Sequence, residues 1–243
     1  MPTTPEGFHE RLTALKRELI AQGRRVQAMV EAAFDAVFAR DAAAARRAID
    51  LDTEIDRVDV ELEKSCVALL GDACGAGCVL APAQLRMVLT VVKINNELER
   101  IADVGVSIAE EARLFSAAEG TIPPTFRVLA NSLVGIIRDA TTSLERTDAE
   151  LARVVLLSEE AVAEFKKALI RDSQDQLSKG RMSLEFAMVL GEVATFCQVI
   201  ADHCTNIAEQ IMYVATGTIV RHMEGHWEEV ALPGDAGRPP DAP

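Results

Sequence analysis

The sequence predicts an all-α protein, and three observations support that prediction. Hydrophobic residues make up 49% of the 243 residues but aromatic residues only 4%, which disfavours β-sandwiches and barrels. The nine prolines leave residues 6–81, 83–122 and 125–232 free of the residue that breaks helices at a cost of about 3 kcal/mol. Within these stretches apolar residues recur every three or four positions, which is the period of one helix face.

The first half of the chain contains three predicted helices. Their apolar stripes lie at residues 12–37, 48–69 and 85–115. Asp41 separates the first two helices, a glycine-rich loop at 71–78 ends the second, and Pro82 suits the first turn of the third. Residues 6–116 are therefore predicted to form one antiparallel three-helix unit.

The second half repeats this organisation after a predicted linker at 117–125, which contains a Pro-Pro pair. Three further apolar stripes lie at residues 126–144, 151–169 and 182–215. A capping box that begins at Thr147 opens the middle helix of this half. The second unit is predicted to span 126–222, and the Gly-, Pro- and Asp-rich residues 223–243 are predicted to be a disordered tail.

The two halves share sequence as well as pattern. Residues 101–110 and 200–209, offset by 99, are identical at six of ten positions. The second helices match at an offset of 107, where Asp41, Ala42, Ala45 and Arg46 align with Asp148, Ala149, Ala152 and Arg153. The fold class predicted is therefore six long helices that form a tandem duplication of an antiparallel three-helix unit.

Two pairs of carboxylates lie at i, i+4 on neighbouring predicted helices. Asp52 and Asp56 share one face of the second helix, with Asp59 three residues further on, and Glu99 and Asp103 share one face of the third. Like charges at this spacing cost a few tenths of a kcal/mol each unless a cation offsets them. Oxygen ligands favour hard metals such as iron, manganese, magnesium or calcium. Solvated helix faces are the alternative interpretation of these pairs.

Charge and motif content narrow the function. With 25 Lys plus Arg against 38 Asp plus Glu, the net charge is −13, which disfavours direct binding to nucleic acid. No run approaches the roughly 18 to 20 apolar residues of a membrane span, and no leader sequence is expected. The odd number of cysteines, five, fits reduced thiols. No nucleophile elbow, phosphate-binding loop or dinucleotide fingerprint predicts an enzyme.

Two segments resemble a known family. Asn96 to Asp103 (NELERIAD) and Asp202 to Glu209 (DHCTNIAE) are similar to the two signature segments of the PhoU family, regulators associated with bacterial phosphate transport. Residues 217–222 (GTIVRH) also resemble the C-terminal end of that family. The resemblance covers about residues 10–222 and agrees with the duplicated six-helix layout.

The resemblance implies a metal site in the first unit. The metal signature of the family is Glu or Asp, three residues, then Asp, in pairs from neighbouring helices. Asp52 with Asp56 and Glu99 with Asp103 match it. The implied ligand is a divalent or trivalent metal ion, with multinuclear iron first and manganese, magnesium and zinc as alternatives.

The second unit departs from the signature. Gln198 stands at the position of Glu99, and Ala163 at that of Asp56. Only Glu159 and Asp202 keep their carboxylates, although Glu160 with Glu164 would substitute if the register is shifted by one residue. This degenerate second site is expected to bind metal weakly or not at all.

By resemblance the protein is a cytoplasmic, non-enzymatic negative regulator of phosphate uptake and of the phosphate-starvation response. The implied partners are the ATPase subunit of a phosphate ABC transporter, a phosphate-sensing histidine kinase and a second copy of the chain. Two alternatives remain open. One is a metal-dependent enzyme that acts on a small phosphorus compound, and the other is a helical scaffold that binds no metal.

Overall fold

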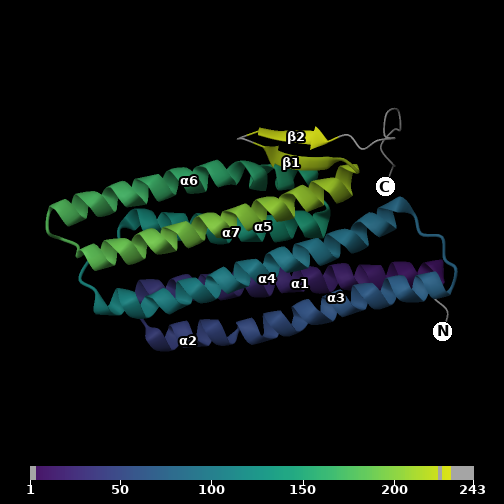
Figure 1. Cartoon of the computed structure of the whole chain (residues 1–243), viewed down its shortest axis with the longest axis horizontal. Coiled ribbons are helices and arrows are strands. Elements are labelled where there is room, and N and C mark those ends of the chain that lie inside the picture. Colours follow the sequence, from purple (N-terminus) through teal and green to yellow (C-terminus); the bar gives the residue numbers. More distant parts are fainter. Residues whose placement is uncertain (1–3, 224–225, 231–243) are drawn as a thin grey trace.

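The computed structural model describes residues 4–223 and 226–230. Within them it contains seven helices and one two-stranded hairpin (Figure 1). In chain order the elements are α1 (Pro5–Ala39), α2 (Ala42–Asp50), α3 (Asp52–Gly75), α4 (Pro82–Ala117), α5 (Pro124–Arg146), α6 (Ala149–Ser178), α7 (Leu184–Thr216), β1 (Ile219–Met223) and β2 (His226–Val230).

The long helices run side by side along the longest axis of the molecule in two groups (Figure 1). The first group contains α1, α3 and α4 with the short α2, and the second contains α5, α6 and α7. The most extensive contacts join α1 to α4, α6 to α7 and, between the two groups, α4 to α7. The predicted all-α duplication is thereby confirmed.

The second predicted helix is divided into two. Asp41 caps α2 by accepting hydrogen bonds from the backbone N–H groups of Ala43 and Ala44, at 2.8 and 3.1 Å. At Leu51 the helix tightens, because the Leu51 N–H bonds to the carbonyl oxygen of Ala48 rather than to one four residues back. Asp52 and Glu54 then occupy the first turn of α3, where acidic side chains are stabilised by the helix dipole. The apolar stripe at 48–69, predicted to lie on one helix, is therefore divided between α2 and α3.

The capping box predicted to begin at Thr147 is wrong by one residue. Asp148 is the N-cap of α6, and its carboxylate accepts a hydrogen bond from the Leu151 N–H at 3.0 Å. Thr147 instead ends α5 in the left-handed region, with a φ of 52°. The connection between the two helices is therefore so short that α5 and α6 must fold back against each other.

A cluster of phenylalanines joins the two groups at one end of the bundle. Phe34 and Phe38 from α1, Phe115 from α4, Phe126 from α5 and Phe186 from α7 pack with ring centroids 5.1 to 6.3 Å apart. Gly120 in the α4–α5 connection passes so close that an added Cβ would lie 2.7 Å from the Phe186 ring. Five of the eight phenylalanines of the chain thus lie where the repeats meet.

α7 is the one helix of the described chain that is long and apolar enough to cross a membrane by length and composition alone. The sequence was predicted to contain no segment as apolar as a membrane span, and α7 differs from that prediction. Many of its apolar residues, among them Phe186, Leu190 and Ile200, are buried inside the bundle, while Leu184 and Met188 are exposed. Core helices of water-soluble proteins pass the same test, so α7 is weak evidence for a membrane span.

The C-terminal hairpin was not predicted. β1 pairs with β2 in antiparallel register, with Ile219 opposite Val230. Strand β2 therefore lies inside the stretch 223–243 that was predicted to be a disordered tail. Residues 224–225 and 231–243 of that stretch lie outside the described residues.

The five cysteines are free thiols, as predicted. Three of them, Cys66, Cys197 and Cys204, are buried in helices. Burial raises the pKa of Cys66 to about 11 and that of Cys197 to about 12, which keeps both thiols protonated and unreactive at neutral pH. These cysteines are packed as small apolar side chains.

Candidate functional site

The antiparallel helices α3 and α4 bring the four predicted ligands of the first unit together. Asp52 and Asp56 lie on α3, and Glu99 and Asp103 on α4. Burial, followed by the charges of Asp56 and Asp103, raises the pKa of Asp52 to about 6. Burial and the charges of Asp103, Asp59 and Asp56 likewise raise the pKa of Glu99. We call the four predicted residues, Asp52, Asp56, Glu99 and Asp103, the α3/α4 carboxylate cluster.

One oxygen of the α3/α4 carboxylate cluster has no hydrogen-bond partner. Asp52 Oδ1 is buried, and no donor reaches it within the described residues. A carboxylate oxygen that has lost its water and gained no donor is costly unless a proton or a metal ion supplies the positive charge. The donor type and this buried oxygen therefore fit a hard cation.

The side chains of the α3/α4 carboxylate cluster do not converge on one point. Among the described residues, no group of three or more His, Cys, Asp or Glu side chains is arranged to hold a metal ion. Neighbouring carboxylates repel one another, and a bound cation is what would draw their oxygens together. The structure places the predicted ligands on facing helices, while their coordination stays a prediction.

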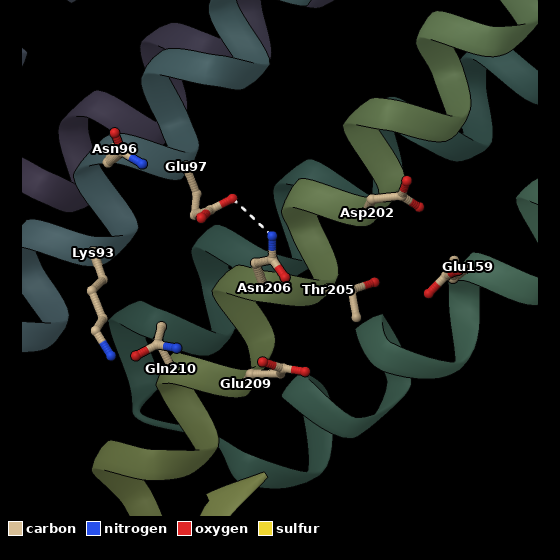
Figure 2. Close-up of a pocket in the computed structure, with 9 residues that line it drawn as sticks. All are labelled: Lys93, Asn96, Glu97, Glu159, Asp202, Thr205, Asn206, Glu209 and Gln210. Carbon is tan, nitrogen blue, oxygen red and sulfur yellow. Dashed lines mark hydrogen bonds between the residues drawn. The ribbon is translucent and has the colours of Figure 1, made fainter. Parts of the chain in front are cut away.

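In the second unit, Glu159 and Asp202 line one groove of about 580 Å³. The groove lies among α4, α6 and α7, with Lys93 across from the two carboxylates (Figure 2). The alignment shifted by one residue would use Glu160 and Glu164 in place of Glu159. In the structure Glu164 is exposed, and its carboxylate pairs with Lys167 at 2.7 Å. The structure therefore favours the register that matches Glu159 with Asp52.

Gln198 lies four residues before Asp202 on α7, as Glu99 lies four residues before Asp103 on α4. Its amide Nε2 donates a hydrogen bond to Asp202 Oδ1 at 3.1 Å. A neutral donor thus contacts the oxygen that a metal would need, and one of the negative charges is missing. Weak or absent metal binding at the second site stays a prediction.

A polar junction between α4 and α7 was not foreseen from the sequence. His203 Nδ1 lies 2.7 Å from Glu97 Oε2. Asn206 donates to the same oxygen at 3.0 Å (Figure 2). Burial alone would raise the pKa of Glu97, but the hydrogen bonds with His203 and Asn206 and the charges of His203 and Arg100 lower it. Both side chains are mostly buried, with 15% of His203 and 19% of Glu97 exposed. The junction therefore ties the two repeats together.

Replacing Glu97 with Gln should destabilise the protein at pH 7 by about 1.5 to 3 kcal/mol, the range for hydrogen bonds to a charged group. A carboxylate whose folded-state pKa is depressed stabilises the fold above its unfolded pKa, near 4.5, and that stability is lost as the pH falls through the folded pKa. The difference between wild type and Glu97→Gln should therefore shrink below about pH 4.5.

Urea unfolding between pH 3 and pH 8 measures this difference. Glu110→Gln, an exposed glutamate on the same helix, is the matched control and should change stability by less than about 0.5 kcal/mol at every pH. A Glu97→Gln effect that is constant across the pH range would contradict the assigned role of the Glu97 charge.

Two tandem three-helix repeats, joined along α4 and α7 and carrying paired carboxylates between adjacent helices, define a class of duplicated helical-bundle proteins. Residues 19–112 and 126–211 each match the family model described as the PhoU domain, so the chain belongs to the PhoU family. The two matched stretches coincide with the two repeats of the structure.

Known relatives are similar along most of their length. A phosphate-specific transport system accessory protein PhoU homolog from Pseudomonas putida is 26% identical over 219 residues, which cover 89% of this chain and 83% of that protein. The phosphate-specific transport system accessory protein PhoU of Escherichia coli is 22% identical over 228 residues, covering 93% and 92%.

Two solved structures share the fold. The phosphate transport system regulatory protein PhoU from Streptococcus pneumoniae superimposes with a TM-score of 0.78 at 19% identity, covering 88% of this chain and 100% of that one. PhoU from Pseudomonas aeruginosa gives 0.75 at 24% identity, covering 85% and 98%. At these identities the likeness establishes the fold.

Proposed function

We propose that this protein is a cytoplasmic negative regulator of phosphate uptake and of the phosphate-starvation response. It acts by binding the transporter ATPase subunit and a phosphate-sensing histidine kinase, without catalysing a reaction. The observation that carries the proposal is the match of both repeats to the PhoU domain. Relatives of similar length are named as accessory proteins of phosphate-specific transport systems, which supports the pathway.

The shape and charge of the molecule suit a docking protein. α6 alone has 30 residues and therefore spans about 45 Å, so the bundle offers long flanks to a partner. A net charge of −13 accelerates association with basic surfaces, and this acceleration decreases as the salt concentration rises. A second copy of the chain is a further proposed partner.

We also propose that the α3/α4 carboxylate cluster binds one or more metal ions, with iron first and manganese, magnesium or zinc as alternatives. Asp52 and Asp56 would hold the metal from α3, and Glu99 and Asp103 from α4. Bound metal supplies positive charge that offsets the repulsion between these carboxylates and links two helices of one repeat. The buried, unpartnered Asp52 Oδ1 supports this assignment.

Deletion of the gene tests the regulatory proposal. Without the protein, phosphate-starvation genes should stay switched on in phosphate-rich medium, and the wild-type gene should restore repression. Transcript levels of those genes in rich and poor medium are the measurement. An unchanged response in the deletion strain would place the task of this protein outside that pathway.

The same strain separates docking from metal binding. A Glu99→Gln, Asp103→Asn double variant removes two charges of the α3/α4 carboxylate cluster and leaves the outer flanks of the second repeat intact. Failure of this variant to restore repression would tie regulation to the metal site, provided that it is folded by circular dichroism. Full restoration would show that docking surfaces act without the metal.

A further inference from the structure

A third facing pair continues the α3/α4 carboxylate cluster along the two helices. Asp59 follows Asp56 by three residues on α3, and Asn95 precedes Glu99 by four on α4, so both lie beside the cluster. Asn95 Nδ2 donates to Asp59 Oδ1 at 2.6 Å and to the Asp59 backbone oxygen at 3.0 Å. The carboxylate of Asp59 is thereby held at a fixed place between the helices.

Asn95 is an unusual residue for a helix interface. Only 2% of its surface is exposed, and its amide oxygen Oδ1 is buried without a hydrogen-bond partner among the described residues. An unsatisfied buried polar atom costs about 1 to 3 kcal/mol, so an apolar residue would pack more favourably here. The side-chain amide of Asn95 donates hydrogen bonds to Asp59, which indicates a role in orienting the Asp59 carboxylate.

The carboxylate of Asp59 is near the ligands predicted on both helices. Asp59 lies about one turn from Asp56 on α3, and its partner Asn95 lies about one turn from Glu99 on α4. Of the two carboxylate oxygens of Asp59, Asn95 contacts Oδ1, and no hydrogen bond to Oδ2 occurs in the described part of the chain. Metal-bound carboxylates are typically held in this way by an outer hydrogen bond on one oxygen, which leaves the other for the metal.

We propose that Asp59 is a fifth carboxylate ligand of the α3/α4 metal site and that Asn95 is a positioning residue that aims the Asp59 carboxylate at the metal. This inference rests on the metal site proposed above. With Asp59 the site has five carboxylates spread along two helices, which are enough to hold more than one hard cation. The buried Asn95 amide is then explained by what it does for Asp59.

Titration of Mn²⁺ into chelator-treated, full-length protein tests the role of Asp59. Asp59→Asn should weaken Mn²⁺ binding at least about tenfold or lower the number of ions bound, measured by calorimetry and by electron paramagnetic resonance. Asp72→Asn is the matched control, because it removes one carboxylate from the same helix where that carboxylate pairs with Arg11. The control should bind Mn²⁺ as wild type does.

A double-mutant cycle tests whether Asn95 acts through Asp59. Asn95→Ala should weaken Mn²⁺ binding about 10- to 100-fold in the wild-type background. The same substitution should have no further effect in the Asp59→Asn background, because the carboxylate that it positions is already gone. Asn95→Leu keeps the buried volume and serves if Asn95→Ala is not folded by circular dichroism.

The outcomes separate this inference from the metal site on which it rests. If wild type binds no Mn²⁺, or if Asp103→Asn binds as wild type does, the metal site itself is wrong. If Asp103→Asn loses binding while Asp59→Asn retains wild-type affinity and stoichiometry, only the role of Asp59 is overturned. Equal effects of Asn95→Ala with and without Asp59 would show that Asn95 acts on the fold alone.

Discussion

Replacing Asp103 with Asn should remove most of the metal that the protein binds, whereas Asp202→Asn should remove little. Asp103 belongs to the α3/α4 carboxylate cluster, in which all four matching carboxylates are present. Asp202 accepts a hydrogen bond from Gln198, and Ala163 replaces a further carboxylate of the second unit. A site with two carboxylates gives a hard cation too few oxygen ligands.

Elemental analysis of protein purified without chelator measures both variants against wild type. The pair is internally matched, because each substitution removes one carboxylate from an exposed position of equivalent helices. Equal losses from the two variants would mean that the second unit contributes as much as the first. Retention of all metal by Asp103→Asn would move the site away from α3 and α4 altogether.

Replacing Phe126 with Ala should destabilise the fold by about 3 to 5 kcal/mol, the usual cost of truncating a buried aromatic residue. Phe126 is fully buried, and its ring centroid lies 6.1 Å from that of Phe34, 5.1 Å from that of Phe38 and 6.3 Å from that of Phe115. The truncation therefore opens a cavity at the point where α5 meets α1 and α4 of the other repeat.

Urea unfolding followed by circular dichroism gives the change in the free energy of unfolding. Val128→Ala is the control on the same helix, because 47% of Val128 is exposed, and it should cost less than about 1 kcal/mol. A Phe126→Ala cost as small as that of the control would show that the phenylalanine cluster does not hold the repeats together.

The fold class follows from the sequence because helix formation along one stripe is a local property. The predicted helix boundaries at Asp41, Pro82 and Pro123-Pro124 are helix starts in the structure. Proline suits a first turn because it lacks an amide hydrogen, and aspartate accepts hydrogen bonds from the free N–H groups there. The offset of 99 residues between 101–110 and 200–209 similarly predicted the duplication that the family match confirms.

The predicted ligands on α3 and α4 could also be paired from sequence, because residues four apart share a helix face whatever surrounds them. Which face of α3 meets which face of α4 depends on how the helices are rotated when they pack. The sequence shows Asp59 as a third acidic residue on α3. Its contact with Asn95, which is 36 residues further along the chain, depends on how the helices pack.

Tertiary structure alone decided the features that join distant parts of the chain. The Glu97 and His203 contact spans 106 residues, and the phenylalanine cluster draws on four helices of both repeats. The sequence by itself determined where helices form, because that depends on neighbours within a few turns. Contacts across the bundle depend on the mutual rotation of α4 and α7 and on how side chains fill the space between them, and no local pattern encodes that geometry.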